Sequence, residues 1–233
     1  MCTVSFVPSE QGIVITSSRD EHFLRLPALP PDSYVVNDVR LTFPKDTQAG
    51  GTWFVMRQDT ASVMVLLNGA FEKHIYNPPY RKSRGLILLD LITNSHDPNI
   101  WDTLDLDDIE PFTIIYCVDQ SLEQWAWDGK QKHRILLPSD IPHIWSSSTL
   151  YEKNIRIERK IWFEEYLTNV EITPENLLRF HKGTKLDDRE NGLIIRRSNG
   201  VRTQSITQAI LKNHSCTMMY ENLADSAVYH EKA

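Results

Sequence analysis

The chain has 233 residues, of which 41% are hydrophobic, enough apolar material for the core of one large domain. Its 31 acidic residues outnumber its 25 basic ones and give a formal net charge of −6, so no broad nucleic-acid-binding surface is expected. No stretch reaches the roughly 18 apolar residues of a membrane span, and no secretory signal pattern is visible. We therefore expect one domain over residues 1–233 and a cytoplasmic location.

The chain opens with Met1 followed by Cys2. Removal of Met1 would leave a free α-amino group beside the Cys2 thiol. The pKa of such an amine is roughly 7.7–8.0 and that of a thiol roughly 8.5, so the amine can accept the thiol proton near neutral pH. Cys2 is therefore a candidate nucleophile, and the alternative is an ordinary strand residue.

Residues 3–17 are predicted to form a β-hairpin, because β-branched and aromatic residues flank the turn segment 8–12. With the turn centred between Glu10 and Gln11, the numbers of paired residues sum to about 21, which sets Cys2 opposite Arg19. An arginine there can lower the pKa of the thiol and bind a carboxylate, while Asp20 can hold an α-ammonium group. A surface Arg–Asp pair is the alternative.

Further along the chain the residue patterns predict mainly strands, with three helical segments. The helices are expected at residues 84–93, 154–167 and 174–181, the last with Thr173 as cap and Gly183 just beyond its end. This order favours an α+β fold with antiparallel sheets and inserted helices. The expected strands are 34–36, 52–56, 62–67, 112–118, 123–126, 193–197, 203–211 and 216–221.

Other candidates for chemistry are weak. Cys117 and Cys216 lie in strand-like segments far apart, which predicts packed free thiols in a reducing compartment. The eight histidines lack the i, i+4 pairing of a helical zinc site, so no metal site is predicted. The acidic segment 105–110 lacks the ligand spacing of an EF-hand and is expected to be a solvated loop.

Several short segments form a series along the chain. Besides Met1-Cys2, the segments are Ser18-Arg19-Asp20-Glu21 with Phe23 and Arg25, Gly50-Gly51-Thr52-Trp53-Phe54, Leu66-Leu67-Asn68, Ser83-Arg84-Gly85, Trp145-Ser146-Ser147-Ser148 and Gly200-Val201-Arg202-Thr203. The series resembles the NRDE family, also called the transport and Golgi organisation 2 family, and its order of Cys, Arg and Asp is similar to that of cysteine N-terminal-nucleophile hydrolases. The family carries Asn at two positions where this chain has Ser18 and Ser147.

The resemblance implies a four-layer αββα sandwich and an amidohydrolase that cleaves a linear amide C–N bond in a small-molecule amide or acyl substrate. Cys2 would be the nucleophile and its own α-amine the base. Arg19 and Asp20 would position and polarise that pair, with Asn68 as the oxyanion donor. This chemistry requires no cofactor and no metal. The alternative is a non-catalytic family member in haem or lipid handling, trafficking or secretory organisation. The resemblance implies substrate contacts from Arg202, Ser147 and Trp145.

Overall fold

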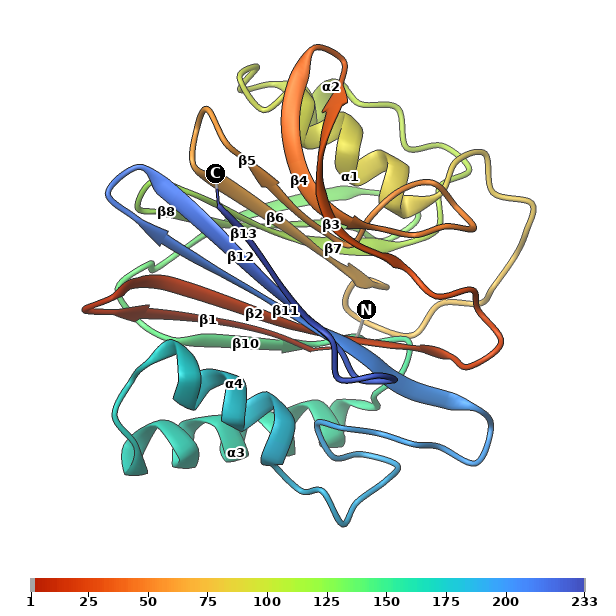
Figure 1. Cartoon of the computed structure of the whole chain (residues 1–233). Helices are drawn as coiled ribbons and strands as arrows, with labels where there is room; N and C mark the ends of the chain where they lie inside the picture. The colour runs from red at the N-terminus through yellow and green to blue at the C-terminus, as the bar shows by residue number, and fades with distance from the viewer. Residues whose placement is uncertain (1–2, 233) are drawn as a thin grey trace.

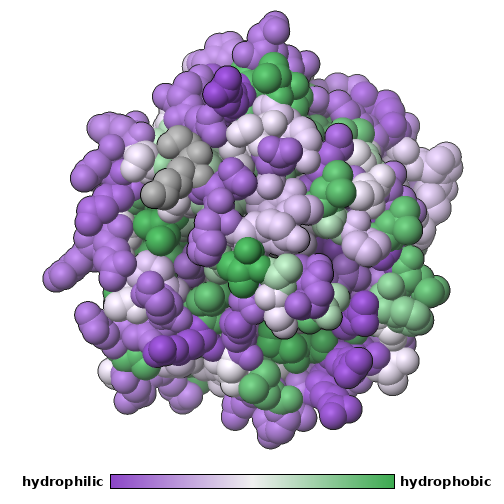
Figure 2. All heavy atoms as spheres, in the orientation of Figure 1, coloured by the Kyte–Doolittle hydropathy of each residue, from purple (hydrophilic) through white to green (hydrophobic). Residues whose placement is uncertain are grey.

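A computed structural model describes residues 3–232, so Cys2 lies outside the described residues. Two antiparallel sheets stack face to face, and helices cover the outer face of each sheet (Figure 1). This is the predicted αββα sandwich. On the face shown in Figure 2, hydrophilic side chains predominate and hydrophobic ones form small separate groups.

The six-stranded sheet contains the predicted hairpin at its centre. Thr3 pairs with Ser18 and Ser9 pairs with Gly12, so the predicted register is confirmed over the described residues. The second hairpin strand also pairs along most of its length with a strand from the C-terminal part of the chain. In spatial order the strands are β10 (His143–Ser146), β1 (Thr3–Ser9), β2 (Gly12–His22), β11 (Val201–Lys212), β12 (Ser215–Asn222) and β13 (Val228–Lys232).

The seven-stranded sheet is a meander in which each strand pairs with the next one along the chain. Strands 39–45, 132–137, 143–146 and 228–232 of the two sheets were not predicted. The meander consists of β3 (Leu29–Val36), β4 (Val39–Lys45), β5 (Phe54–Arg57), β6 (Ser62–Asn68), β7 (Phe112–Val118), β8 (Ser121–Trp127) and β9 (Lys132–Leu137).

The helices are α1 (Arg84–Thr93), α2 (Ile100–Thr103), α3 (Lys153–Asn169) and α4 (Pro174–Gly183). Thr173 caps α4 as predicted, because its side chain accepts a hydrogen bond from the Asn176 N–H. Gly183 was predicted to lie just beyond α4, but it is the last residue of the helix, and Thr184 is the C-cap. Within residues 3–232, no helix is both long and apolar enough to cross a membrane.

The predicted strand at 193–197 is wrong. Leu193 and Ile195 are buried, which explains the strand-like pattern, but the segment forms no continuous ladder with its neighbour β11. The Leu193 N–H donates to the Thr184 carbonyl, whereas the Ile195 N–H donates to the Thr203 side chain of β11. A single bridge joins Arg196 to Arg202 of β11. Apolar residues here anchor a loop to the helices and to the start of β11.

Three apolar layers hold the sandwich together. Alternating side chains of β1 and β2 divide between two of them, because neighbouring residues on a strand point to opposite faces. Val4 and Phe6 lie in the core between the sheets, whereas Val7 and Val14 pack against α3 and α4. The third layer lies between the seven-stranded sheet and α1, and includes Leu88. The cores therefore fix which face of each strand meets the space between the sheets.

Candidate active site

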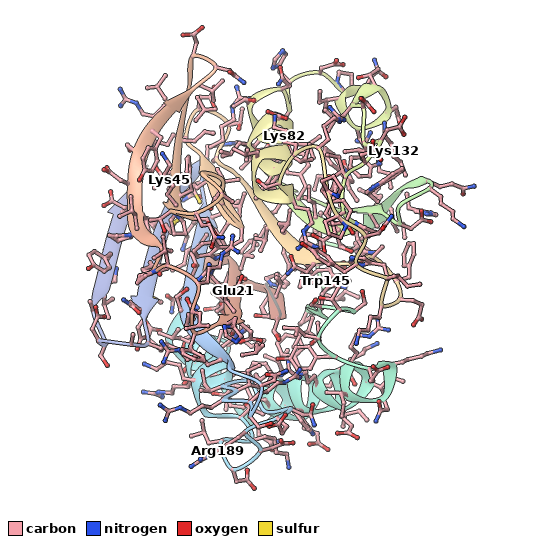
Figure 3. All side chains as sticks on the ribbon, turned by 90° about the vertical axis from the view of Figure 1, so that its right-hand side faces the viewer. Glu21, Lys45, Lys82, Lys132, Trp145 and Arg189 are labelled. Carbon is pink, nitrogen blue, oxygen red and sulfur yellow. The ribbon has the colours of Figure 1, made fainter. Side chains whose placement is uncertain are left out.

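A cleft of about 390 Å³ opens beside the ends of β2 and β6, within the range of ordinary small-molecule sites. Figure 3 views this side of the molecule, with Glu21 from β2 and Lys82 from the loop before α1. Of the predicted site residues, the structure brings Arg19 and Asn68 together in this cleft. Other lining residues that matter below are Arg25, Asp46, Trp53, Tyr76, Arg84, Gly85 and Glu110.

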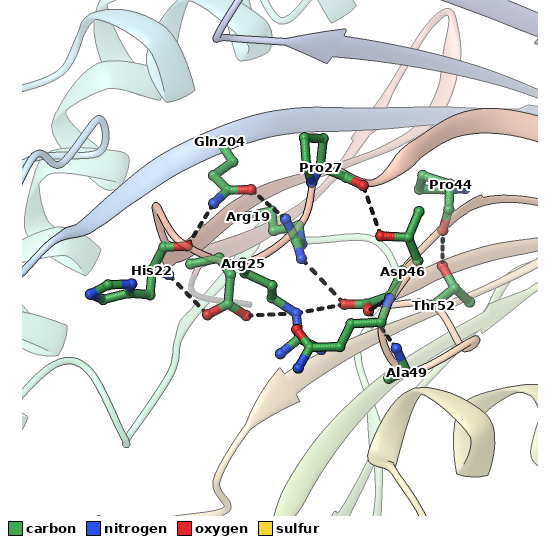
Figure 4. Close-up of polar contacts among 12 residues, drawn as sticks. Arg19, His22, Arg25, Pro27, Pro44, Asp46, Ala49, Thr52 and Gln204 are labelled. Carbon is green, nitrogen blue, oxygen red and sulfur yellow. Dashed lines mark hydrogen bonds and ion pairs between the residues drawn. The ribbon is translucent and has the colours of Figure 1, made fainter.

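Arg19 is buried in the cleft wall, with only 3% of its surface exposed. Its Nη1 donates to Gln204 Oε1 at 2.6 Å and its Nη2 to Asp46 Oδ2 at 3.3 Å (Figure 4). The guanidinium also lies over the Trp53 ring, 4.4 Å from the ring centre. Burial lowers the pKa of Arg19, and the carboxylates of Glu21 and Asp46 oppose that shift. The result is a rigid cation facing the cleft.

Asp46, which the sequence analysis missed, is shared by two arginines. Its Oδ2 also accepts from Arg25 Nε at 2.9 Å, and its Oδ1 accepts from the Ala49 N–H at 2.8 Å. Burial by itself would raise the pKa of Asp46, but the hydrogen bonds from Arg25 and Ala49 outweigh it and lower the pKa. The position of Asp46 four residues before Gly50 was the available signal, since aspartates often accept hydrogen bonds from the backbone of such turns.

Asp20 lies on the opposite face of β2 from Arg19, as alternation requires. Its carboxylate accepts hydrogen bonds from Tyr151 Oη at 2.8 Å and from Thr203 Oγ1 at 2.6 Å. Thr203 is also the strand partner of Asp20 on β11, so the Gly200–Thr203 segment and the Arg19-Asp20 pair meet in the sheet. Asp20 is buried behind the cleft and does not line it.

Ser147 supports Asn68 from behind. Its Oγ donates to the Asn68 carbonyl at 2.7 Å and contacts Thr149 Oγ1 at 2.8 Å. Ser147 is buried and lies with Trp145 in a neighbouring hollow of about 290 Å³, not in the cleft. Trp145 donates to Gln124 Oε1 and thereby joins the two sheets. Arg202 lines a separate groove beside the cleft.

Ser18, which replaces the family asparagine, faces α4 and not the cleft. Its Oγ lies 2.9 Å from His181 Nδ1, and Ser5 Oγ lies 2.8 Å from His181 Nε2. A neutral imidazole has one donor and one acceptor nitrogen, so His181 can satisfy both hydroxyls. Serine in place of the family asparagine at position 18 therefore affects the packing of α4 against the hairpin of β1 and β2.

The start of β1 is fixed by Arg159, a second residue that the sequence analysis missed. This α3 side chain is fully buried, and its Nη1 donates to Thr3 Oγ1 at 2.5 Å. Its Nη2 donates to the Asn191 carbonyl at 3.0 Å, and its guanidinium lies 3.5 Å from the centre of the Tyr151 ring. Carbonyl groups and a ring face replace the carboxylate that usually partners a buried arginine.

Gly51 and Gly85, from two of the segments that resemble the family, lie against each other in the cleft wall. A Cβ on Gly51 would lie 2.4 Å from the Gly85 carbonyl carbon, and one on Gly85 would lie 2.7 Å from the Thr52 oxygen. No side chain fits at such distances, so both glycines are needed for this close backbone approach. The contact sets the first turn of α1 against the cleft.

The remaining wall is polar and charged. Glu110 accepts from Arg84 Nη2 at 3.1 Å and lies 3.1 Å from His74 Nε2. The acidic segment 105–110 is a loop as predicted, but Glu110 faces the cleft. Within residues 3–232, no three His, Cys, Asp or Glu side chains are grouped to hold a metal ion.

The prediction that Cys117 and Cys216 are packed free thiols is confirmed, since both are buried and unpaired. Burial raises the pKa of Cys117 to about 12 and also raises the pKa of Cys216. We expect a thiol reagent at neutral pH to modify one thiol per folded chain, and two more after unfolding. Peptide mapping should place the fast label on Cys2; equal labelling of all three thiols in the folded protein would contradict this.

The layered sheets, the outer helices and the cleft at the end of the central hairpin define the fold of the N-terminal-nucleophile hydrolases. The structure is similar to that of penicillin V acylase from Agrobacterium tumefaciens, with a TM-score of 0.59, 8% sequence identity, and coverage of 100% of this chain and 86% of the acylase chain. At this identity the similarity shows the fold alone.

The sequence model of the Transport and Golgi organisation 2 family matches residues 1–220. The chain belongs to this family. A comparison with curated proteins finds no match.

Proposed function

We propose that this chain is a cysteine N-terminal-nucleophile amidohydrolase that cleaves a linear amide C–N bond. The supporting observation is the buried cationic Arg19 in the cleft wall, one residue beyond Ser18, the strand partner of Thr3. Cys2 directly precedes Thr3 in the chain. Pairing continued by one residue would set Cys2 opposite Arg19, on the face that meets the cleft.

In the proposed reaction the Cys2 thiol gives its proton to its own α-amine, and the thiolate attacks the amide carbonyl carbon. A C–S bond forms and the carbonyl oxygen becomes an oxyanion. The α-ammonium then gives the proton to the leaving nitrogen as the C–N bond breaks. Water, deprotonated by the same amine, hydrolyses the thioester and releases a carboxylic acid, which regenerates the thiol.

The described residues supply the other roles. Arg19 would favour the thiolate, because a cation nearby lowers the pKa of a thiol. Asp20, on the other face of β2, would hold the α-ammonium with the hydrogen-bonded support of Tyr151 and Thr203. Asn68 would donate to the oxyanion, and Ser147 would fix the Asn68 backbone through its carbonyl.

Intact-mass analysis tests the proposal directly. After incubation with a panel of N-acyl amino acids and lactams, we expect the wild-type protein to gain the mass of one acyl group. The adduct should disappear in Cys2→Ser and persist in Cys117→Ser, a matched thiol replacement in the core.

Two results would contradict an enzyme. Retention of Met1 on every molecule from the native host would remove the proposed base. Stoichiometric haem or lipid binding without any acyl adduct would favour the non-catalytic alternative.

A further inference from the structure

A second groove, of about 490 Å³, lies beside the cleft. Arg25 lines both hollows. Gln204 lines the groove while its Oε1 accepts the hydrogen bond from Arg19 and its Nε2 donates to the His22 carbonyl (Figure 4). The cleft and the groove therefore share Arg25 as a common lining residue, and Gln204 of the groove is hydrogen-bonded to Arg19 of the cleft.

Two arginines that line the groove, Arg196 and Arg202, are available to bind an anion. Among the described residues, the side chains of Arg196 and Arg202 form no ion pair or hydrogen bond, whereas Arg25 is paired with Asp46 and Glu21. Asp225, the one acid among the described residues that line the groove, already accepts hydrogen bonds from Asn222 and from the Ala227 N–H. Unpaired guanidinium groups on a concave surface bind oxyanions, to which they can donate in pairs.

Apolar and aromatic side chains also line the groove. Phe23 is 51% exposed, yet its ring stacks on His22 with 4.9 Å between ring centres. Its backbone N–H donates to the Gly200 carbonyl at 2.9 Å. Other apolar or aromatic lining residues include Ile194, Leu223 and Tyr220. An exposed but positioned aromatic ring is suited to cover an apolar ligand.

We propose that the groove binds an apolar organic group that ends in an oxyanion. Resting on the proposed amidohydrolase function, this group is the part of the substrate that extends from the scissile amide. Arg196 and Arg202 bind the oxyanion, and Phe23 covers the apolar stem. The substrate class is then an amide with an apolar arm that carries a carboxylate or a phosphate.

Calorimetric titration of the Cys2→Ser protein tests the groove without any turnover. The probes are N-acetyl-8-aminooctanoate, its neutral methyl ester, and 8-acetamidooctyl phosphate. We expect at least one anion to bind about tenfold more tightly than the ester. A tenfold ratio of dissociation constants corresponds to the usual contribution of one hydrogen bond to a charged group. The tighter anion identifies the oxyanion; equal affinities for all three probes would overturn the proposal.

Variants locate the effect. Arg202→Gln and Arg196→Gln, each in the Cys2→Ser background, should reduce anion affinity about tenfold and leave ester affinity unchanged. Arg40→Gln is the control, because Arg40 is exposed on β4 and lines neither hollow. Arg196 is also exposed, so its replacement tests the site even where Arg202→Gln does not fold. Equal losses in Arg40→Gln and Arg196→Gln would overturn the proposal.

The two proposals fail in different ways. If the amidohydrolase proposal is wrong, the wild-type protein forms no acyl adduct, but the titrations can still show a preference for anions. If the groove proposal is wrong, the adduct on Cys2 still forms, while the protein does not distinguish the acid from its ester.

Discussion

Replacement of Arg19 by Met should slow acylation of Cys2 about 10- to 30-fold at pH 7, because an adjacent cation lowers the pKa of a thiol by about 1 to 3 units from roughly 8.5. Without that cation the Cys2 thiol would ionise at higher pH, and the thiolate fraction at neutral pH would fall. The loss should shrink as pH is raised, since the thiol then ionises without help. The measurement is the acylation rate against pH, followed by intact mass.

The stability change of Arg19→Met should be modest. Asp46 keeps its hydrogen bonds from Arg25 and the Ala49 N–H, so no unpaired carboxylate is left behind. The matched control is Arg57→Met, another buried arginine, which donates to the Ile92 and Thr93 carbonyls away from the cleft. Arg57→Met should cost about 1–3 kcal/mol of stability and leave acylation unchanged. An Arg19→Met protein that loses stability but acylates Cys2 at the normal rate would make Arg19 a structural residue.

Acid should destabilise the protein through His181. Burial, with a smaller contribution from Arg159, lowers the pKa of His181 from 6.5 to about 3. Below pH 6.5 the unfolded chain binds a proton that the folded protein excludes, so this stability is complete above pH 6.5 and declines as pH falls toward 3. We expect unfolding at pH 5 to require about 2 kcal/mol less than at pH 8 on account of this residue.

Urea unfolding at pH 8 and pH 5 measures the effect. His181→Gln retains a donor and an acceptor for the Ser5 and Ser18 hydroxyls but does not titrate. The pH dependence of its stability should therefore be smaller than that of the wild type by the amount given above. A wild-type His181 ring that takes up a proton near pH 6 in an NMR titration of the folded protein would refute this prediction, whether or not the variant folds.

Much of the local structure follows from the sequence by itself. The register of β1 and β2 depends on the position of the turn and on the alternation of apolar side chains. A turn between Glu10 and Gln11 requires paired residue numbers to sum to 21, which places Thr3 opposite Ser18, as observed. The start of α4 follows from Thr173 and Pro174, whose effects act within one helical turn. Strand β4 was missed although its hairpin turn, Asn37-Asp38, has the positive φ angles of 49° and 62° that favour these residue types.

Only the tertiary structure decided the surroundings of the site. The partners of Arg19 are 27 residues away at Asp46 and 185 residues away at Gln204, and no local pattern records such pairs. Alternation placed Arg19 and Asp20 on opposite faces, but the pairing of β2 with β11 supplied Thr203 behind Asp20. The segment 193–197 has the apolar residues of a strand and forms none, because a strand requires a ladder of paired residues and this segment meets β11 in a single bridge.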